Sequence, residues 1–402
     1  MQPLPQPHQR WIETPAMASA SASVSASELI PVLPDDTGIQ YLGEGAANIV
    51  YHISVRYPTP PPSLIEEYGD GTPPPSEIED VEDRASRAAA LHIFDNKLLR
   101  LRKDLPTTAP CAVAQENWLR LVAPLFDADQ LVQQSLVQIR TANVIEKLNK
   151  ELNGWEHNKY PLRGSLRSVD PRPTQRHGIY LADDEHGLLV TDMTPGSALN
   201  EEVHEFKPKW LLQSPSAPPG SIRCRQCARN ARMKAIFARE YPHLAPNKYF
   251  CPLDLVSEDR RAIALVASQM DSVPSKALIL RRWLESNTLL KRLRDAQRKL
   301  DPKGIFLSDP TTEDFCVAMT LRDCTVFLRL SGKGKEGHIE ARLGDLDVKC
   351  PDKAEYWKAT EQQLIDEGWY TGTEKAEDRQ PLLCSLSSDR WKIVNSMRNG
   401  LN

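Results

Sequence analysis

The residues whose types and spacing best suit chemistry lie in residues 204–210, HEFKPKW. Alternate side chains of a β-strand share a face, so Glu205, Lys207 and Lys209 would point the same way in a strand. Pro208 has no amide hydrogen for a sheet ladder, which favours an edge strand or a strand end. One acid and two cations that converge at a strand end indicate a site for a phosphorylated ligand. A solvated edge strand, guarded by lysines against aggregation, is the alternative interpretation.

A glycine-containing segment, GEGAANIV at residues 43–50, separates two predicted strands. Small side chains let backbone N–H groups approach the phosphates of a nucleotide, as in the glycine-rich loop of kinases. An ordinary hairpin turn is the alternative. Arg100 and Lys103 follow on the next predicted strand, where a cation would neutralise such phosphates. The candidate nucleotide-binding residues of the turn are Gly43, Glu44, Gly45, Ala46, Ala47 and Asn48.

Two aspartates later in the chain complete a pattern for phosphoryl transfer. Asp323 starts one predicted strand, and Asp345 ends another. Phosphoryl transfer uses one carboxylate to accept the hydroxyl proton and another to hold Mg²⁺. Each aspartate taken alone is better explained as a turn or strand-end cap. Asp347 would share the face of Asp345 if the strand continued, either as a second metal ligand or as a solvent-facing residue.

Cys224 and Cys227, in the segment CRQC, have the spacing of zinc ligands. A structural zinc site needs four ligands, and His243 and Cys251 are the candidates for the other two. Because no second CxxC is present, free thiols in a reduced loop are the preferred interpretation. The same segment is rich in cations, which are Arg223, Arg225, Arg229, Arg232 and Lys234. Such a run is usually a solvated face.

Composition narrows the classes of protein to consider. The chain has 402 residues, with 50 Lys and Arg against 54 Asp and Glu, and a formal net charge of −4. This balance argues against a generally basic nucleic-acid binder. No apolar run is long enough to span a bilayer, no signal peptide is evident, and the 8 cysteines do not resemble a disulfide framework. We therefore expect a reducing compartment, the nucleus or the cytoplasm.

The order of the predicted elements indicates an α+β fold. Residues 1–33 form a low-complexity tail and residues 58–83 an acidic, proline-rich loop insertion, and we expect both to be disordered. Residues 41–55 are predicted to form a strand, a glycine turn and a second strand, and the other predicted strands are residues 98–103, 187–193, 323–330 and 339–349. The predicted helices are residues 111–121, 130–152 and 257–299, with a last helix from about Lys353.

Taken in order, these motifs resemble those of the inositol-pentakisphosphate 2-kinase family. The matching strings run from about residue 41 to residue 353, and EFKPK, PLDL, RDC and DLDVK are the most specific. The resemblance implies a two-lobed kinase-like fold with an ATP cleft between the lobes. Residues 34–198 would form an N-lobe around an antiparallel sheet. Residues 199–402 would form a larger mixed α/β C-lobe that binds inositol phosphate, and the tail favours a fungal-type member.

The resemblance also implies transfer of the γ-phosphate of ATP to the 2-hydroxyl of inositol 1,3,4,5,6-pentakisphosphate, giving inositol hexakisphosphate (phytate). Residues 43–48 would cover the nucleotide phosphates, which Arg100 and Lys103 would contact. Asp192 would lie where the hinge meets adenine, and Glu205 would bind the ribose hydroxyls.

On the acceptor side, the resemblance makes Asp323 the base for the 2-hydroxyl, with Lys207 beside the transferred group. Asp345 would bind Mg²⁺, and Asp323 is a second candidate for that ion. A ring with five phosphates needs many cations. Those implied to contact it are Lys207, Lys209, Lys349, Lys353, Arg172, Lys234 and, in place of a histidine of the family, Arg229.

Two other functions fit parts of the sequence. A non-catalytic scaffold that binds inositol polyphosphates would use the same fold, but intact Lys207, Asp323 and Asp345 argue against it. A zinc-dependent nucleic-acid module built on CRQC would bind RNA in a salt-sensitive way, which the acidic net charge disfavours. We therefore expect a monomeric kinase that uses ATP and Mg²⁺, with no membrane or direct nucleic-acid partner.

Overall fold

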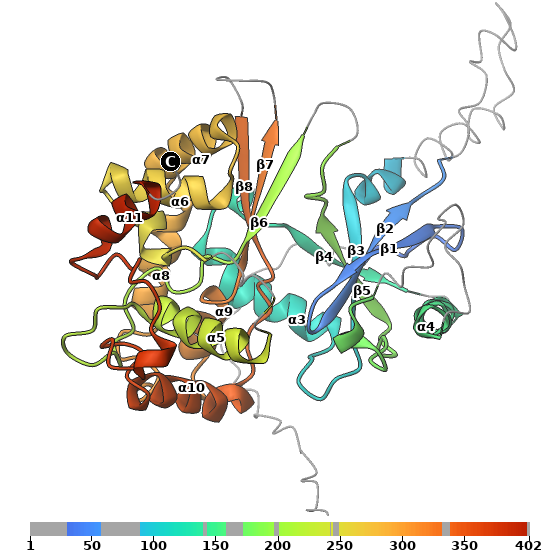
Figure 1. Cartoon of the computed structure of the whole chain (residues 1–402). Coiled ribbons are helices and arrows are strands. Elements are labelled where there is room, and N and C mark those ends of the chain that lie inside the picture. The colour runs from blue at the N-terminus through green and yellow to red at the C-terminus, as the bar shows by residue number, and fades with distance from the viewer. Residues whose placement is uncertain are drawn as a thin grey trace, which may run out of the picture.

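The chain forms a mixed α+β fold with two antiparallel sheets, seen here in a computed structural model (Figure 1). The structure describes residues 30–57, 89–139, 143–157, 172–196, 201–241, 243, 249–331 and 338–399. The disorder expected for residues 1–29 and 58–83 lies outside these residues. The α+β prediction is confirmed.

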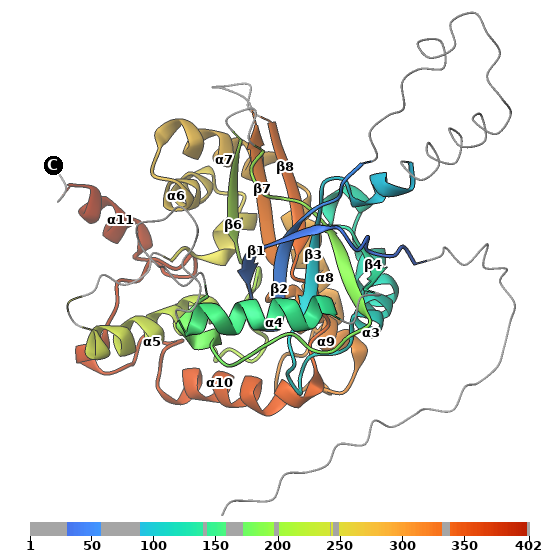
Figure 2. The ribbon, with the colours of Figure 1, turned by 90° about the vertical axis from the view of Figure 1, so that its right-hand side faces the viewer.

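The first sheet has five strands in the order β1-β2-β3-β5-β4. Their bounds are Gly38–Glu44 for β1, Asn48–Ser54 for β2, Lys97–Arg102 for β3, Gln134–Gln138 for β4 and His186–Thr191 for β5. Alternation along β3 turns Leu99 and Leu101 into a core shared with helix α4 (Asn143–Glu156), which lies across the sheet in Figure 2. Arg100 is consequently left on the opposite face.

Two findings at the β4 edge of this sheet differ from the sequence predictions. The tail ends earlier than residue 33, because Val32 bridges Gln138 and only 3% of the apolar Leu33 is exposed. Residues 130–152 are not one helix, because β4 occupies part of them and only α4 is helical. Five alternating residues are too few to distinguish a strand from a helical pattern, so pairing with β5 decides.

The second sheet has three antiparallel strands in the order β6-β7-β8. Their bounds are Glu202–Phe206, Thr325–Ser331 and His338–Gly344. β6 is an edge strand that ends two residues before Pro208, which confirms the prediction made from the proline. Because the neighbours are antiparallel, the ends of β6 and β8 meet the start of β7 at one end of the sheet.

Helices cover the second sheet. The predicted helical region 257–299 forms α6 (Arg260–Met270), α7 (Pro274–Ser286) and α8 (Leu289–Leu300), which Figure 1 shows on the side of this sheet away from the first. With α9 (Glu313–Leu321) they share one apolar core with the strands. The other helices include α3 (Cys111–Asn117), α5 (Arg225–Glu240), α10 (Ala354–Asp366) and α11 (Arg390–Asn399). Among the described residues, no helix combines the length and apolar character needed to cross a membrane.

Candidate active site

A pocket of about 600 Å³ lies between the two sheets. Its apolar walls include Val50, Leu98 and Val190 from the first sheet and Phe327 from the second. The polar side chains that line it include Arg100, Gln134, Glu205 and Asp345. A cavity of this size, with apolar walls and a few polar groups, is typical of a site for a small molecule.

The turn between β1 and β2 forms one wall of the pocket. Its lining residues are Gly43, Glu44, Gly45 and Asn48, and the expected Ala46 and Ala47 are not among them. The Gly45 amide donates to the Asn48 carbonyl oxygen at 2.9 Å, which closes the turn. A Cβ atom added to Gly43 or Gly45 would meet no other atom within 4 Å. A ligand can therefore approach the backbone closely at these glycines.

The charges next to this turn are paired inside the protein. The side chains of Glu44, Lys103 and Arg172 are 0% exposed, and both cations form ion pairs with Glu44. Lys103 also donates to the Gly45 carbonyl oxygen at 2.9 Å, and Arg172 pairs with Glu156. Burial opposes ionisation of Glu44, but the two cations outweigh it and lower its pKa. Lys103 and Arg172 therefore hold the turn from within, and their expected contacts with ligand phosphates remain predictions.

The ends of β6, β7 and β8 bring together three lysines and two aspartates, here called the strand-end cluster: Lys207, Lys209, Lys349, Asp323 and Asp345. Lys209 and Lys349 donate to the two carboxylate oxygens of Asp323, each at 2.8 Å. Lys207 donates to Asp345 Oδ2 at 2.7 Å and to the main-chain oxygen of Asp323 at 2.8 Å. The sequence analysis named all five residues, and the structure joins them in one network of hydrogen bonds.

Two members of the cluster, Asp323 and Lys207, are kept charged by their neighbours. Burial opposes ionisation of Asp323, but Lys349 and Lys209 outweigh it and hold its pKa well below its usual range. Burial also opposes the charge of Lys207, whereas the Asp345 carboxylate raises its pKa. Asp323 is therefore a carboxylate and Lys207 an ammonium at neutral pH.

Two members of the cluster have an unusual backbone conformation. The φ angle is 57° at Lys209 and 56° at Asp345, in the left-handed region that few residues other than glycine adopt. The fully buried Gln297 fixes this conformation by donating its amide to the Lys209 carbonyl oxygen at 2.9 Å. The left-handed Lys209 also breaks the strict strand alternation predicted for this segment. Backbone strain of this kind concentrates at functional sites.

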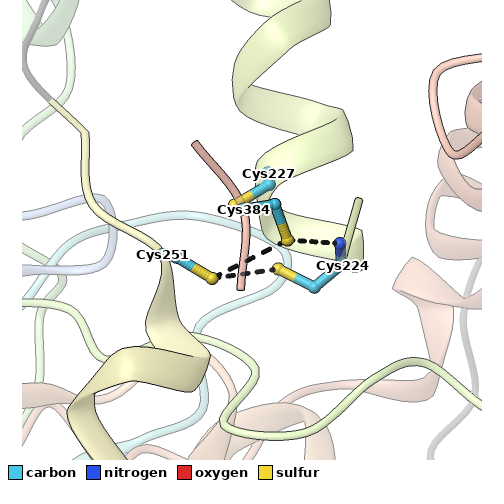
Figure 3. Close-up of side chains that lie close together, drawn as sticks. All are labelled: Cys224, Cys227, Cys251 and Cys384. Atoms are coloured by element: carbon cyan, nitrogen blue, oxygen red, sulfur yellow. Dashed lines mark hydrogen bonds between the residues drawn. The ribbon is translucent and has the colours of Figure 1, made fainter. Parts of the chain in front are cut away.

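Four cysteines form a second cluster (Figure 3). Cys224 and Cys227 lie at the start of α5, Cys251 precedes the short helix η6 (Pro252–Val256), and Cys384 comes from the C-terminal segment. The four Sγ atoms lie within 4.8 Å of one another, with 3.9 Å from Cys224 to Cys251 and 3.8 Å from Cys251 to Cys384. These separations exclude disulfides. They match the S···S separation of about 3.8 Å expected for four sulfurs at about 2.3 Å from a tetrahedral ion.

The fourth cysteine corrects the ligand set expected from the sequence. His243 is among the described residues but does not belong to the cluster, where Cys384 takes its place. The neighbouring Cys224 thiol holds the pKa of Cys227 well above its ordinary value. A bound cation reverses this effect, because metal binding favours thiolates. Four converging sulfurs can thus hold a metal ion. The free-thiol interpretation was preferred because a ligand was missing, and Cys384 removes that reason.

The sequence of this chain is similar to those of known proteins. The sequence model of the inositol-pentakisphosphate 2-kinase family matches residues 41–363. The chain belongs to this family. It is 32% identical over 170 residues to an inositol-pentakisphosphate 2-kinase of Yarrowia lipolytica, covering 41% of this chain and 53% of the relative. It is 31% identical over 182 residues to a protein of the same name from Kluyveromyces lactis, covering 44% and 54%. The chain thus spans about half the length of the curated relatives it matches.

Not every residue assigned from the resemblance to the 2-kinase family lies at the pocket. The carboxylate of Asp192 accepts hydrogen bonds from the amide and hydroxyl of Thr194, each at 2.7 Å, and its neighbours Thr191 and Met193 line the pocket instead. Lys234 lies 5.4 Å over the Tyr249 ring, beside the cysteine cluster.

Arg229 and Lys353 are half-buried, and neither lines the pocket between the sheets. Within the described part of the chain, neither of them nor Lys234 bonds to the strand-end cluster. Their expected contacts with inositol phosphates remain predictions.

Proposed function

We propose that this protein transfers the γ-phosphate of ATP to the 2-hydroxyl of inositol 1,3,4,5,6-pentakisphosphate and so forms inositol hexakisphosphate. Membership of the family supports this reaction. The observation that carries the proposal is that the pocket adjoins the strand-end cluster, because Asp345 belongs to both. A nucleotide in the pocket would direct its terminal phosphate at the lysines and at Asp323.

The two sheets would serve as the centres of two kinase lobes, with the pocket as the ATP cleft between them. The apolar walls suit a purine ring, and Glu205 is the candidate acceptor for the ribose hydroxyls. Arg100 Nε and Gln134 Nε2 are buried and have no hydrogen-bond partner within the described residues. Both residues also line the pocket, where a guanidinium and an amide suit a ligand rich in acceptor oxygens, such as a triphosphate.

The strand-end cluster would bind and orient the acceptor. Lys207, Lys209 and Lys349 would turn to the phosphates of the ring, which frees Asp323 to accept the proton of the 2-hydroxyl. Asp345 would hold Mg²⁺, which neutralises charge on a transferred phosphoryl group when bound. Since a carboxylate is a weak base towards a hydroxyl, positioning and charge neutralisation contribute more than proton removal does.

The full chain, incubated with ATP, Mg²⁺ and inositol 1,3,4,5,6-pentakisphosphate, is expected to yield inositol hexakisphosphate. Ion-exchange chromatography measures the product. A pentakisphosphate whose free hydroxyl lies elsewhere on the ring is the matched control, and it should give little product. Binding of the polyphosphate without consumption of ATP would contradict the kinase and favour a non-catalytic scaffold.

We also propose that the cysteine cluster holds a structural zinc ion. Four cysteine ligands leave no coordination position for water or substrate, as in closed structural zinc sites. The ion would join the start of α5 to the residue before η6 and to the C-terminal segment. A buried ion pair between Asp254 of η6 and Arg390 of α11 connects two of the same regions.

One zinc ion per chain is expected from mass-spectrometric metal analysis of the purified protein. Cys384→Ser removes one sulfur ligand, so it should lower the zinc content well below half and reduce the melting temperature by about 5 °C or more. His243→Ala is the matched control, and it should keep the full zinc content. A zinc content unchanged by Cys384→Ser would exclude this ligand set.

A further inference from the structure

Asp347 joins the two sheets across the edge of the pocket. It follows β8, yet its carboxylate accepts hydrogen bonds from the first sheet. The donors are Asn48 Nδ2 at 2.9 Å, Arg100 Nη2 at 3.1 Å and Arg102 Nη1 at 2.5 Å. The Asp347 carboxylate is thus held by two arginines and an asparagine, whereas the sequence left it open as a second metal ligand or a solvent-facing residue.

The charges make this contact strong. The Asp347 carboxylate forms ion pairs with Arg100 at 3.1 Å and with Arg102 at 2.5 Å. Charge-assisted hydrogen bonds to arginine are among the strongest polar contacts in proteins. Two of the partners of Asp347 also bond to each other, because Asn48 Oδ1 accepts a hydrogen bond from Arg102 Nη1 at 2.8 Å.

The partners of Asp347 belong to the nucleotide side of the pocket, whereas its chain neighbours belong to the acceptor side. Arg100 and Asn48 line the pocket. Asp345 and Lys349, each two residues from Asp347, are members of the strand-end cluster. Thr320 ties this segment together, because its hydroxyl accepts from the Lys349 amide at 2.9 Å and contacts the Asp347 carbonyl oxygen at 3.4 Å.

We propose that Asp347 is a positioning residue that couples the binding of the nucleotide to the binding of the inositol phosphate; this rests on the proposed function. A nucleotide phosphate bound to Arg100 holds its guanidinium in place. The guanidinium in turn holds the Asp347 carboxylate, and with it residues 345–349. A polyphosphate on Lys349 fixes the same segment from the other side. The ligand that binds first bears the cost of ordering the segment, so the second binds more tightly. The coupling must be equal in both directions.

Calorimetry on the full chain tests this coupling without turnover, using ADP and inositol 1,3,4,5,6-pentakisphosphate. Saturating ADP should lower the Kd of the polyphosphate about five- to tenfold in the natural protein, with the reciprocal effect on ADP. In Asp347→Asn, which keeps the shape of the side chain but loses its charge, the ratio should fall below about twofold. The exposed Asp314→Asn is the matched control, and it should keep the full ratio.

Equal coupling in Asp347→Asn, or no coupling in the natural protein, would overturn the proposal. A role in folding alone would weaken both single-ligand affinities and leave their ratio unchanged. If Asp347→Asn does not fold, Arg100→Lys gives the same test, because lysine keeps a cation in the pocket but cannot bridge a phosphate and Asp347. The two proposals fail separately, since absence of phosphate transfer would leave the measured ratio intact.

Discussion

Asp323→Asn is expected to lower kcat about 100- to 10,000-fold. Its Kd for the inositol polyphosphate should rise no more than about threefold above that of the natural protein, or should fall. Asparagine keeps the shape of the side chain but cannot accept the hydroxyl proton. It also removes one of the two oxygens to which Lys209 and Lys349 donate, so that one of these lysines can turn to a substrate phosphate. Single-turnover kinetics and calorimetry measure the two quantities separately.

The matched control is Asp314→Asn, on the exposed first turn of the helix that leads to Asp323, and its kcat should be unchanged. The pH profile adds a second test. Because Lys349 and Lys209 depress the pKa of Asp323, the natural protein should lose no activity to protonation of this group between about pH 6 and pH 8. Full turnover in Asp323→Asn would remove it from the chemistry.

Most of the strand-end cluster could be predicted from the sequence, because short sequence patterns mark the strand ends where its residues lie. Pro208 marks the end of β6, and apolar runs next to Asp323 and Asp345 mark the start of β7 and the end of β8. Antiparallel pairing then brings these ends together. The left-handed backbone at Lys209 and Asp345 could not be predicted, because contacts such as that of Gln297 with the Lys209 carbonyl oxygen impose it.

Several partners were missed because they are distant in the sequence. Cys384 lies 133 residues from Cys251, Asp347 lies 247 residues from Arg100, and Arg172 lies 128 residues from Glu44. A lone cysteine, acid or arginine in a loop carries no spacing signal. A sequence also gives no sign of the buried partner of a cation, so the ion pairs of Arg172 and Lys103 with Glu44 could not be predicted.

Lys207→Met is expected to lower kcat/KM about 100- to 1,000-fold, the usual effect of removing one group that stabilises charge in a transition state. Lys207 bonds to both aspartates of the strand-end cluster, at the Asp345 carboxylate and the Asp323 carbonyl oxygen. The raised pKa of Lys207 keeps it charged, as its proposed contact with the transferred phosphate requires. Methionine has a similar length but no charge, so the loss should fall mainly on kcat.

Lys303→Met is the matched control, because Lys303 is exposed and has no ion pair among the described residues. Lys207→Arg separates charge from geometry. It should restore part of the binding but little of the turnover, since a planar guanidinium cannot reproduce the compact contacts of the ammonium with Asp345 and Asp323. Equal kcat values for Lys207→Met and Lys303→Met would show that the phosphate is transferred at a different part of the molecule.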